Sequence, residues 1–116
     1  MKDRKKLIGQ MGERIVSKYL SAKGYRILER NFFSRYGEID IIALDGKELV
    51  FVEVKTRRNE DYGYASQAVT PKKRYNLIRT SRKYMAMTQV ESLDYRYDVV
   101  ECYWETQTIR HICNAF

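Results

Sequence analysis

The sequence has few of the residues that build zinc sites and disulfide frameworks. Its 116 residues include one histidine, His111, and two cysteines, Cys102 and Cys113. A single histidine excludes a multi-histidine zinc site, and a lone histidine on a strand is usually structural. Two cysteines without metal-ligand spacing are typical of free thiols in a reducing compartment. We therefore expect no disulfide and no cysteine-based metal site.

Long apolar segments are also missing. No run reaches the roughly 18 apolar residues of a membrane span, and no apolar core follows the basic residues 1–6. We expect a cytoplasmic protein with no membrane partner. Hydrophobic residues make up 44% of the chain and charged residues 32%, which is typical of a globular protein. A chain of this length has room for one core, so we predict a single domain over residues 1–116.

The central motif is a β-hairpin around Asp45-Gly46, which separates two apolar runs. Asp-Gly is a strong signal for a two-residue hairpin loop. With Asp45 and Gly46 as the loop, Leu44 pairs with Lys47. The two strands are apolar on both faces, which indicates a buried, central position in the sheet.

Charged side chains gather at the open end of this hairpin. Because side chains alternate along a strand, Glu38, Asp40, Glu53 and Lys55 are expected on one face. Asp40 and Glu53 would be diagonal neighbours with backbones roughly 7–8 Å apart, which leaves room for a metal ion. The alternative is a structural network of lysine and carboxylates. The opposite face is expected to be core, formed by Ile39, Ile41, Ala43, Val50, Val52 and Val54.

A first helix is predicted before Gly24, which is a typical helix C-cap. Glu13 lies on one edge of this helix, where Gly9 would permit close packing against the sheet. Glu13 would then reach over the sheet toward the hairpin carboxylates. The alternative is an exposed glutamate that pairs locally with Arg14 or Lys18.

A second helix is predicted to begin at Thr70 as N-cap, with Pro71 in the first turn. Lys72, Lys73 and Arg74 follow at once, although cations at a helix N-terminus oppose the helix dipole. The net charge of +7 favours a polyanionic partner. We therefore expect this end of the helix to attract phosphate; the alternative is an ordinary solvated face.

The remaining segments complete an α/β fold. Strands are predicted over residues 25–33, 95–104 and 109–113, and the polar segment 58–66 reads as a loop. Tyr62, in this loop, would stack on bases or pack onto the domain. Asp98 is interpreted as structural. The element order is αβββαββ, a mixed β-sheet flanked by helices.

These motifs resemble the PD-(D/E)XK nucleases of the restriction-endonuclease-like superfamily. The closer resemblance is to the YraN-type family of uncharacterised bacterial proteins, likened to Holliday-junction resolvases. The matching motifs are Gln10-Met11-Gly12-Glu13, Asn31 to Asp40, Glu53-Val54-Lys55-Thr56-Arg57 and Gln67-Ala68-Val69-Thr70-Pro71-Lys72-Lys73. One departure is Ile39, which stands where the superfamily name has proline.

The resemblance implies a metal-dependent nuclease with Mg²⁺ as cofactor, for which Mn²⁺ would substitute. The implied catalytic set is Asp40, Glu53, Lys55, Glu13 and Gln67, of which Glu13, Asp40 and Glu53 ligate the metal. Glu38 receives no role. The resemblance also implies attack by water in line with the leaving group, which leaves a 5′ phosphate.

The expected substrate is nucleic acid, most simply DNA at branched or single-stranded sites. Lys72, Lys73, Arg74, Arg57 and Tyr62 are expected to hold it. The chain is expected to fold alone, but a homodimer would suit a four-way junction, because two-fold symmetry brings two equivalent sites to opposed strands. Two alternatives remain, a nucleic-acid-binding module without catalysis and an interaction subunit of a DNA-processing complex.

Overall fold

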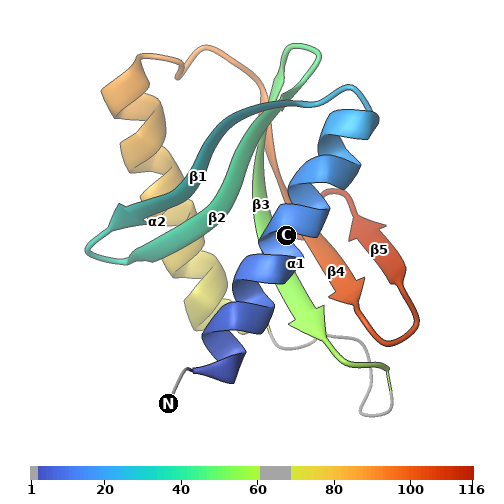
Figure 1. The fold of residues 1–116 in the computed structure, drawn as a ribbon. Coiled ribbons are helices and arrows are strands. Elements are labelled where there is room, and N and C mark those ends of the chain that lie inside the picture. Colours follow the sequence, from blue (N-terminus) through green and yellow to red (C-terminus); the bar gives the residue numbers. More distant parts are fainter. Residues whose placement is uncertain (1–2, 61–68) are drawn as a thin grey trace.

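One helix covers each face of a five-stranded mixed sheet (Figure 1). The computed structural model describes residues 3–60 and 69–116. The elements are α1 (Arg4–Ala22), β1 (Arg26–Ser34), β2 (Gly37–Asp45), β3 (Glu48–Arg57), α2 (Pro71–Thr88), β4 (Tyr95–Tyr103) and β5 (Thr108–Ile112). The strand order is β1-β2-β3-β4-β5, and only β3 and β4 run parallel. The predicted fold class and element order are confirmed.

Helix α1 ends where the sequence predicts. Gly24 has φ +94°, a conformation that glycine adopts without steric cost. The N–H of Tyr25 bonds to the carbonyl of Leu20, and the N–H of Gly24 bonds to the carbonyl of Ser21. These two bonds form a Schellman motif, which satisfies carbonyls left open by the end of the helix.

The predicted hairpin exists, but its register differs from our expectation. Leu44 pairs with Leu49, not with Lys47, and the loop is Gly46-Lys47. Gly46 has φ +61°, whereas Asp45 is not among the residues with positive φ. Glycine at the first loop position is typical of a type II′ turn. The register shift is an even number of residues, so it leaves each β3 side chain on its expected face.

Two apolar clusters separate the faces of the sheet. The α1 side contains Val16, Leu20, Tyr25, Ile41, Ala43, Val50, Val52, Val100 and Cys102. The α2 side contains Ile39, Ile42, Leu49, Phe51, Leu77, Tyr84, Met85 and Tyr97. The expectation that Ile39 shares a face with Ile41 is therefore wrong. The alternation changes phase at Asp40, directly beyond the last pair of the β2–β3 ladder, Ile41 with Val52.

Helix α2 begins as predicted. The Thr70 side chain accepts a hydrogen bond from the backbone N–H of Lys73 at 3.2 Å, and Pro71 is the first helical residue. Neither α1 nor α2, the two helices within the described ranges, combines the length and the apolar character that a membrane span requires.

Candidate functional site

The β2–β3 hairpin opens at Asp40, and this opening creates the candidate site. The ladder stops at the pair Ile41–Val52. Beyond this pair, the backbone N–H of Val54 donates a hydrogen bond to the side-chain Oδ2 of Asp40 at 2.8 Å. A carboxylate thus takes the place of a backbone carbonyl as acceptor, so the strand end remains satisfied while its side chains converge.

The predicted catalytic side chains line one cavity of about 640 Å³, formed by α1, β2, β3 and α2. Asp40 and Glu53 come from the hairpin, Lys55 from the next outward position of β3, and Glu13 from α1. The structure therefore brings together four of the five predicted catalytic residues. Gln67, the fifth, lies outside the described residues.

Asp40 and Glu53 form a closely spaced carboxyl pair. Burial first, and then the charge of Glu53, raise the pKa of Asp40 to about 8, against the hydrogen bond from Val54. A hydrogen bond also joins the two carboxyl groups. Glu53 is only 6% exposed. Asp40 therefore retains its proton at neutral pH, and a bound metal ion would favour its ionised form instead.

Glu13 and Glu38 lie near this pair and enlarge it to a group of four acids. Burial raises the pKa of both groups, and for Glu38 the charges of Glu13 and Glu53 add to the effect. The side chain of Asn31 bridges them: with its amide nitrogen turned toward the acids, it donates to Glu38 at 3.0 Å and to Glu13 at 2.9 Å. Glu38, which received no role from the sequence, thus belongs to the same acidic group.

Asn31 is a site residue that sequence reasoning missed. Its backbone has φ +55°, in the left-handed region, which asparagine tolerates better than most residues. The available signal was an asparagine inside an otherwise strand-forming segment. Its side chain lies close to Glu13, and in that orientation its hydrogen bond lowers the pKa that burial raises.

Two lysines, one from β3 and one from α2, contact the same oxygen of Glu53. Nζ of Lys73 lies 2.7 Å and Nζ of Lys55 3.2 Å from Oε2 of Glu53. Burial lowers the pKa of Lys55, and the neighbouring Lys73 lowers it further. Burial would also lower the pKa of Lys73, but its hydrogen bond to Glu53 raises it. Lys55 is therefore the lysine suited to accept a proton, and Lys73 the fixed cation.

Close contact between α1 and β3 holds Glu13 over the sheet. A Cβ atom on Gly12 would collide with Oγ1 of Thr56, whereas a Cβ atom on Gly9 would meet nothing within 4 Å. We expected Gly9 to permit the close approach, and that assignment is wrong. Gly12 lies one residue before Glu13. The close packing of Gly12 against β3 therefore also sets the distance between Glu13 and the sheet.

The predicted nucleic-acid contacts fall in three places. Arg57 is exposed and lines the same cavity, and its guanidinium donates to the carbonyl of Thr56. Lys72 and Arg74 are exposed at the start of α2. Lys73, grouped with them in our prediction, instead pairs with Glu53. Tyr62 lies outside the described residues.

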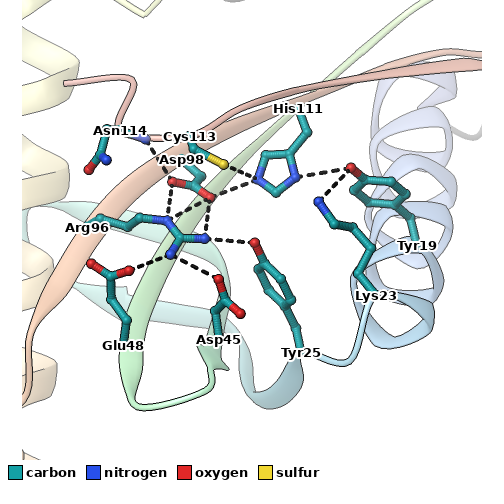
Figure 2. Close-up of polar contacts among 10 residues, drawn as sticks. All are labelled: Tyr19, Lys23, Tyr25, Asp45, Glu48, Arg96, Asp98, His111, Cys113 and Asn114. Carbon is teal, nitrogen blue, oxygen red and sulfur yellow. Dashed lines mark hydrogen bonds and ion pairs between the residues drawn. The ribbon is translucent and has the colours of Figure 1, made fainter.

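A second polar cluster lies between β4, β5 and the C-terminal end of α1, with Arg96 and Asp98 at its centre (Figure 2). Nε of Arg96 donates to Asp98 Oδ1 at 3.0 Å, and the backbone N–H of Asn114 donates to the same oxygen at 3.1 Å. His111 lies 2.8 Å from Oδ2. Burial would raise the pKa of Asp98, but these hydrogen bonds lower it. Asp98 therefore fastens β5 and the chain end to the sheet, and its structural interpretation agrees with these contacts.

The two clusters differ in their suitability for a metal. Three side chains of the second cluster, Asp98, His111 and Cys113, place a carboxylate oxygen, an imidazole nitrogen and a thiol sulfur within 4.8 Å of one another. No other group of three potential metal ligands in the described residues is this compact. Both oxygens of Asp98 already accept hydrogen bonds, so a metal would have to displace them. The group of Glu13, Asp40 and Glu53 is looser. Mg²⁺ binds through one or two carboxylates and keeps several waters, so a looser acidic group fits it.

The fold and the site together define an α/β protein with a carboxylate–lysine cluster at the open end of a central hairpin. The model of the uncharacterised protein family UPF0102 matches residues 12–102. The chain belongs to this family, which confirms the family expected from the sequence motifs. The matched span includes Glu13, Asp40, Glu53 and Lys55.

Similar proteins extend over nearly the whole chain. A UPF0102 protein of Alkaliphilus metalliredigens is 44% identical over 112 residues, which cover 96% of this chain and 98% of that protein. One of Caldanaerobacter subterraneus subsp. tengcongensis is 41% identical over 117 residues, covering 97% and 96%. One of Clostridioides difficile is 42% identical over 108 residues, covering 93% and 95%. These names carry no activity, so function has to be argued from the site.

Proposed function

We propose that this chain is a metal-dependent nuclease that hydrolyses phosphodiester bonds of DNA, with branched and single-stranded DNA as its first candidate substrates. The observation that carries the proposal is the shared cavity of Glu13, Asp40, Glu53 and Lys55. Acids with raised pKa values beside a lysine with a lowered pKa are typical of a catalytic site. The likeness of these motifs to PD-(D/E)XK nucleases supports the same conclusion.

Charge balance supports a divalent cation as cofactor. Four carboxylates, those of Glu13, Glu38, Asp40 and Glu53, face the two ammonium groups of Lys55 and Lys73. With all four acids ionised and both lysines protonated, the excess of two negative charges equals the charge of one Mg²⁺ or Mn²⁺. A bound ion would therefore favour loss of the proton that Asp40 holds in the metal-free protein. Carboxylate and water ligands accept both ions. Asp40 and Glu53 would hold the metal, and Glu13 would complete the group.

Each residue then has a chemical role. A bound metal would polarise the scissile phosphate and lower the pKa of a water molecule. Lys55, whose pKa is already lowered, accepts a proton from the attacking water or steadies the charge that develops on phosphate. Arg57 lies at the mouth of the cavity and meets the DNA backbone there. Lys72 and Arg74 bind phosphates at the start of α2, while Gln67 and Tyr62 are proposed to contact metal ligands and bases.

One contact favours a second candidate, a nucleic-acid-binding module without catalysis. Lys73 already occupies Oε2 of Glu53 at 2.7 Å, so an ammonium group stands where a metal ion would bind. In a catalytic protein this ion pair has to open when the metal enters. In a binding module it would persist, and the basic residues alone would hold DNA.

The test compares cleavage by the native protein, Lys55→Ala and Asp40→Ala. Labelled duplex, single-stranded, flap and four-way-junction DNAs are incubated with Mg²⁺, Mn²⁺ or EDTA. We expect metal-dependent product that falls by about 10²–10³-fold in both variants. The exposed Lys47→Ala and Asp94→Ala serve as matched controls and should cleave normally.

Two other results would overturn the proposal. Salt-dependent binding without product in any metal, unchanged in both variants, would establish the binding module. Absence of both binding and cleavage would leave an interaction subunit, to be sought through a protein partner. Measurement of molecular mass with and without a four-way junction decides whether a homodimer forms.

A further inference from the structure

Two arginines converge on one tyrosine at the turn between β1 and β2. Arg35 and Tyr36 form this turn, and α2 brings Arg79 beside it. The phenol oxygen of Tyr36 accepts hydrogen bonds from Nη2 of Arg35 at 2.8 Å and from Nη2 of Arg79 at 2.5 Å. Cζ of Arg79 also lies 3.7 Å from the centroid of the Tyr36 ring. The two guanidinium groups are therefore held close together by one neutral oxygen.

No carboxylate of the described residues pairs directly with either arginine. Among residues 3–60 and 69–116, neither Arg35 nor Arg79 forms an ion pair with a carboxylate within 4.0 Å. The hydrogen bond from Arg35 and the charges of both arginines lower the pKa of the Tyr36 phenol. Two like charges repel at this separation, and an anion placed between them would relieve the repulsion. A phosphate suits such a place, since guanidinium groups bind it in a bidentate manner.

A purely structural role does not account for both arginines. Ser34 and Thr80 already join the same turn to the same helix through a hydrogen bond of 2.7 Å between their hydroxyl groups. Arg79 strengthens that attachment. Arg35 belongs to the turn itself, next to Tyr36, so its guanidinium adds positive charge to the junction without adding a link to α2.

The arginine pair continues a basic and aromatic stripe along α2. Residues three or four apart share one face of a helix, and Lys72, Tyr75, Arg79 and Lys83 follow this spacing. Tyr75 is 57% exposed, and Lys72 and Lys83 are exposed. The stripe starts beside Lys73, which reaches into the carboxylate cluster. Such alternation of cations and aromatic rings is typical of surfaces that follow a nucleic-acid strand.

We propose that Arg35 and Arg79, positioned by Tyr36, bind one backbone phosphate of the DNA whose scissile bond lies at the carboxylate cluster. This inference rests on the proposed function, because it takes DNA as the ligand. Lys73 and Arg79 are six residues apart, about 9 Å along the helix. One strand of a duplex advances 3.4 Å per phosphate, so the bound phosphate lies about two to three nucleotides from the cleaved bond.

The first test measures DNA affinity in EDTA, so that no cleavage is needed. Arg35→Gln and Arg79→Gln should each raise Kd about 5- to 10-fold at 0.1 M salt, and lower the slope of log K against log salt by about one. Arg26→Gln, an exposed arginine on β1, is the matched control and should bind like the native protein. Tyr36→Phe keeps both charges, so it should retain the salt slope and weaken binding less.

The second test locates the phosphate. Single neutral methylphosphonate linkages are scanned along the DNA, and one or two positions should weaken binding to the native protein but not to Arg79→Gln. Native-like binding by both arginine variants, or a scan that Arg79→Gln leaves unchanged, would overturn the inference.

These outcomes are separable from those of the nuclease test. Native cleavage with unaltered affinity of both arginine variants refutes the arginine site alone. Affinity lost in these variants without cleavage by the native protein refutes the nuclease alone. Absence of DNA binding by the native protein refutes both.

Discussion

Asp40, which is half-buried, and Asp98, which is fully buried, are carboxylates on inner strands of one sheet, yet their surroundings have opposite effects. Asp98 is 0% exposed and accepts hydrogen bonds from Arg96, His111 and the backbone of Asn114, which lower its pKa. Burial and Glu53 raise the pKa of Asp40 to about 8. A buried acid whose oxygens already accept hydrogen bonds from the protein has a structural role. A half-buried acid among other acids is available to bind a proton or a cation.

Arg96 shows how the structural cluster is completed. It donates to Asp98, to Glu48 at 2.6 Å and to Asp45 at 3.2 Å, and its Nη2 donates to Tyr25 at 2.7 Å (Figure 2). Burial would lower the pKa of its guanidinium, but Asp98 and Glu48 raise it. Within residues 3–60 and 69–116, no arginine forms an ion pair with an acid of the carboxylate cluster, and its two lysines both contact one oxygen of Glu53.

The largest effect on stability should come from Asp98→Ala. The substitution leaves the 8% exposed Arg96 short of a partner and unties Asn114, so we expect the free energy of unfolding to fall by about 3–5 kcal/mol. Urea denaturation at pH 7 measures it, with the exposed Asp94→Ala as control, expected within about 0.5 kcal/mol of the native protein. A loss below about 1 kcal/mol would show that Asp98 does not have the structural role that distinguishes it from Asp40.

Asp40→Asn should instead stabilise the metal-free protein at pH 8 by a few kcal/mol, since each unit of pKa shift corresponds to about 1.4 kcal/mol. The folded pKa of Asp40, about 8, lies above its ordinary value of 3.8. The folded state therefore binds this proton more tightly than the unfolded state, so native stability falls as pH rises from 4 to 8. Asparagine does not titrate and removes this slope.

Denaturation curves in EDTA at pH 5 and pH 8 test this prediction. The two proteins should differ more at pH 8 than at pH 5. Asp98 has the opposite effect on the pH dependence of stability. Its lowered pKa stabilises the folded protein above about pH 4, and that contribution is lost as pH falls further. Parallel pH profiles for the native protein and Asp40→Asn would mean that Asp40 titrates normally.

Gly12→Ala should destabilise the fold by about 1–3 kcal/mol, because its methyl group forces α1 away from Thr56. Gly9→Ala is the matched control on the same helix. With nothing within 4 Å of its Cβ, it should stabilise the helix by about 0.5–1 kcal/mol. Thermal unfolding compares them. Equal melting temperatures would show that α1 is free to shift, and that Glu13 is not held over the hairpin by this contact.

The smallest effect should be stabilisation by metal. At ten times its Kd, Mg²⁺ adds about 1.4 kcal/mol, a rise in Tm of about 3–8 °C. Asp40→Asn should abolish this rise, whereas Cys113→Ser should keep it, since Cys113 belongs to the second cluster. A thermal shift that is lost in Cys113→Ser and kept in Asp40→Asn would reverse the assignment of the two clusters.

Local sequence signals predicted much of the framework. Thr70-Pro71 marked the start of α2 and Gly24 the end of α1, because caps depend on a few adjacent residues. The hairpin was found, but its register was wrong. Asp45-Gly46 and Gly46-Lys47 both supply a loop with one glycine, and only the packed sheet chooses between them.

The sequence by itself determined the element order, the apolar faces of the central strands and the grouping of Asp40, Glu53 and Lys55, because strand alternation fixes which side chains share a surface. Tertiary structure decided what these groups meet. The phase change at Asp40, the Asn31 bridge, the pairing of Lys73 with Glu53 and the enclosure of Asp98 join residues from separate elements. Burial and neighbouring charge set whether a carboxylate is held or available, and both arise only when distant segments pack together.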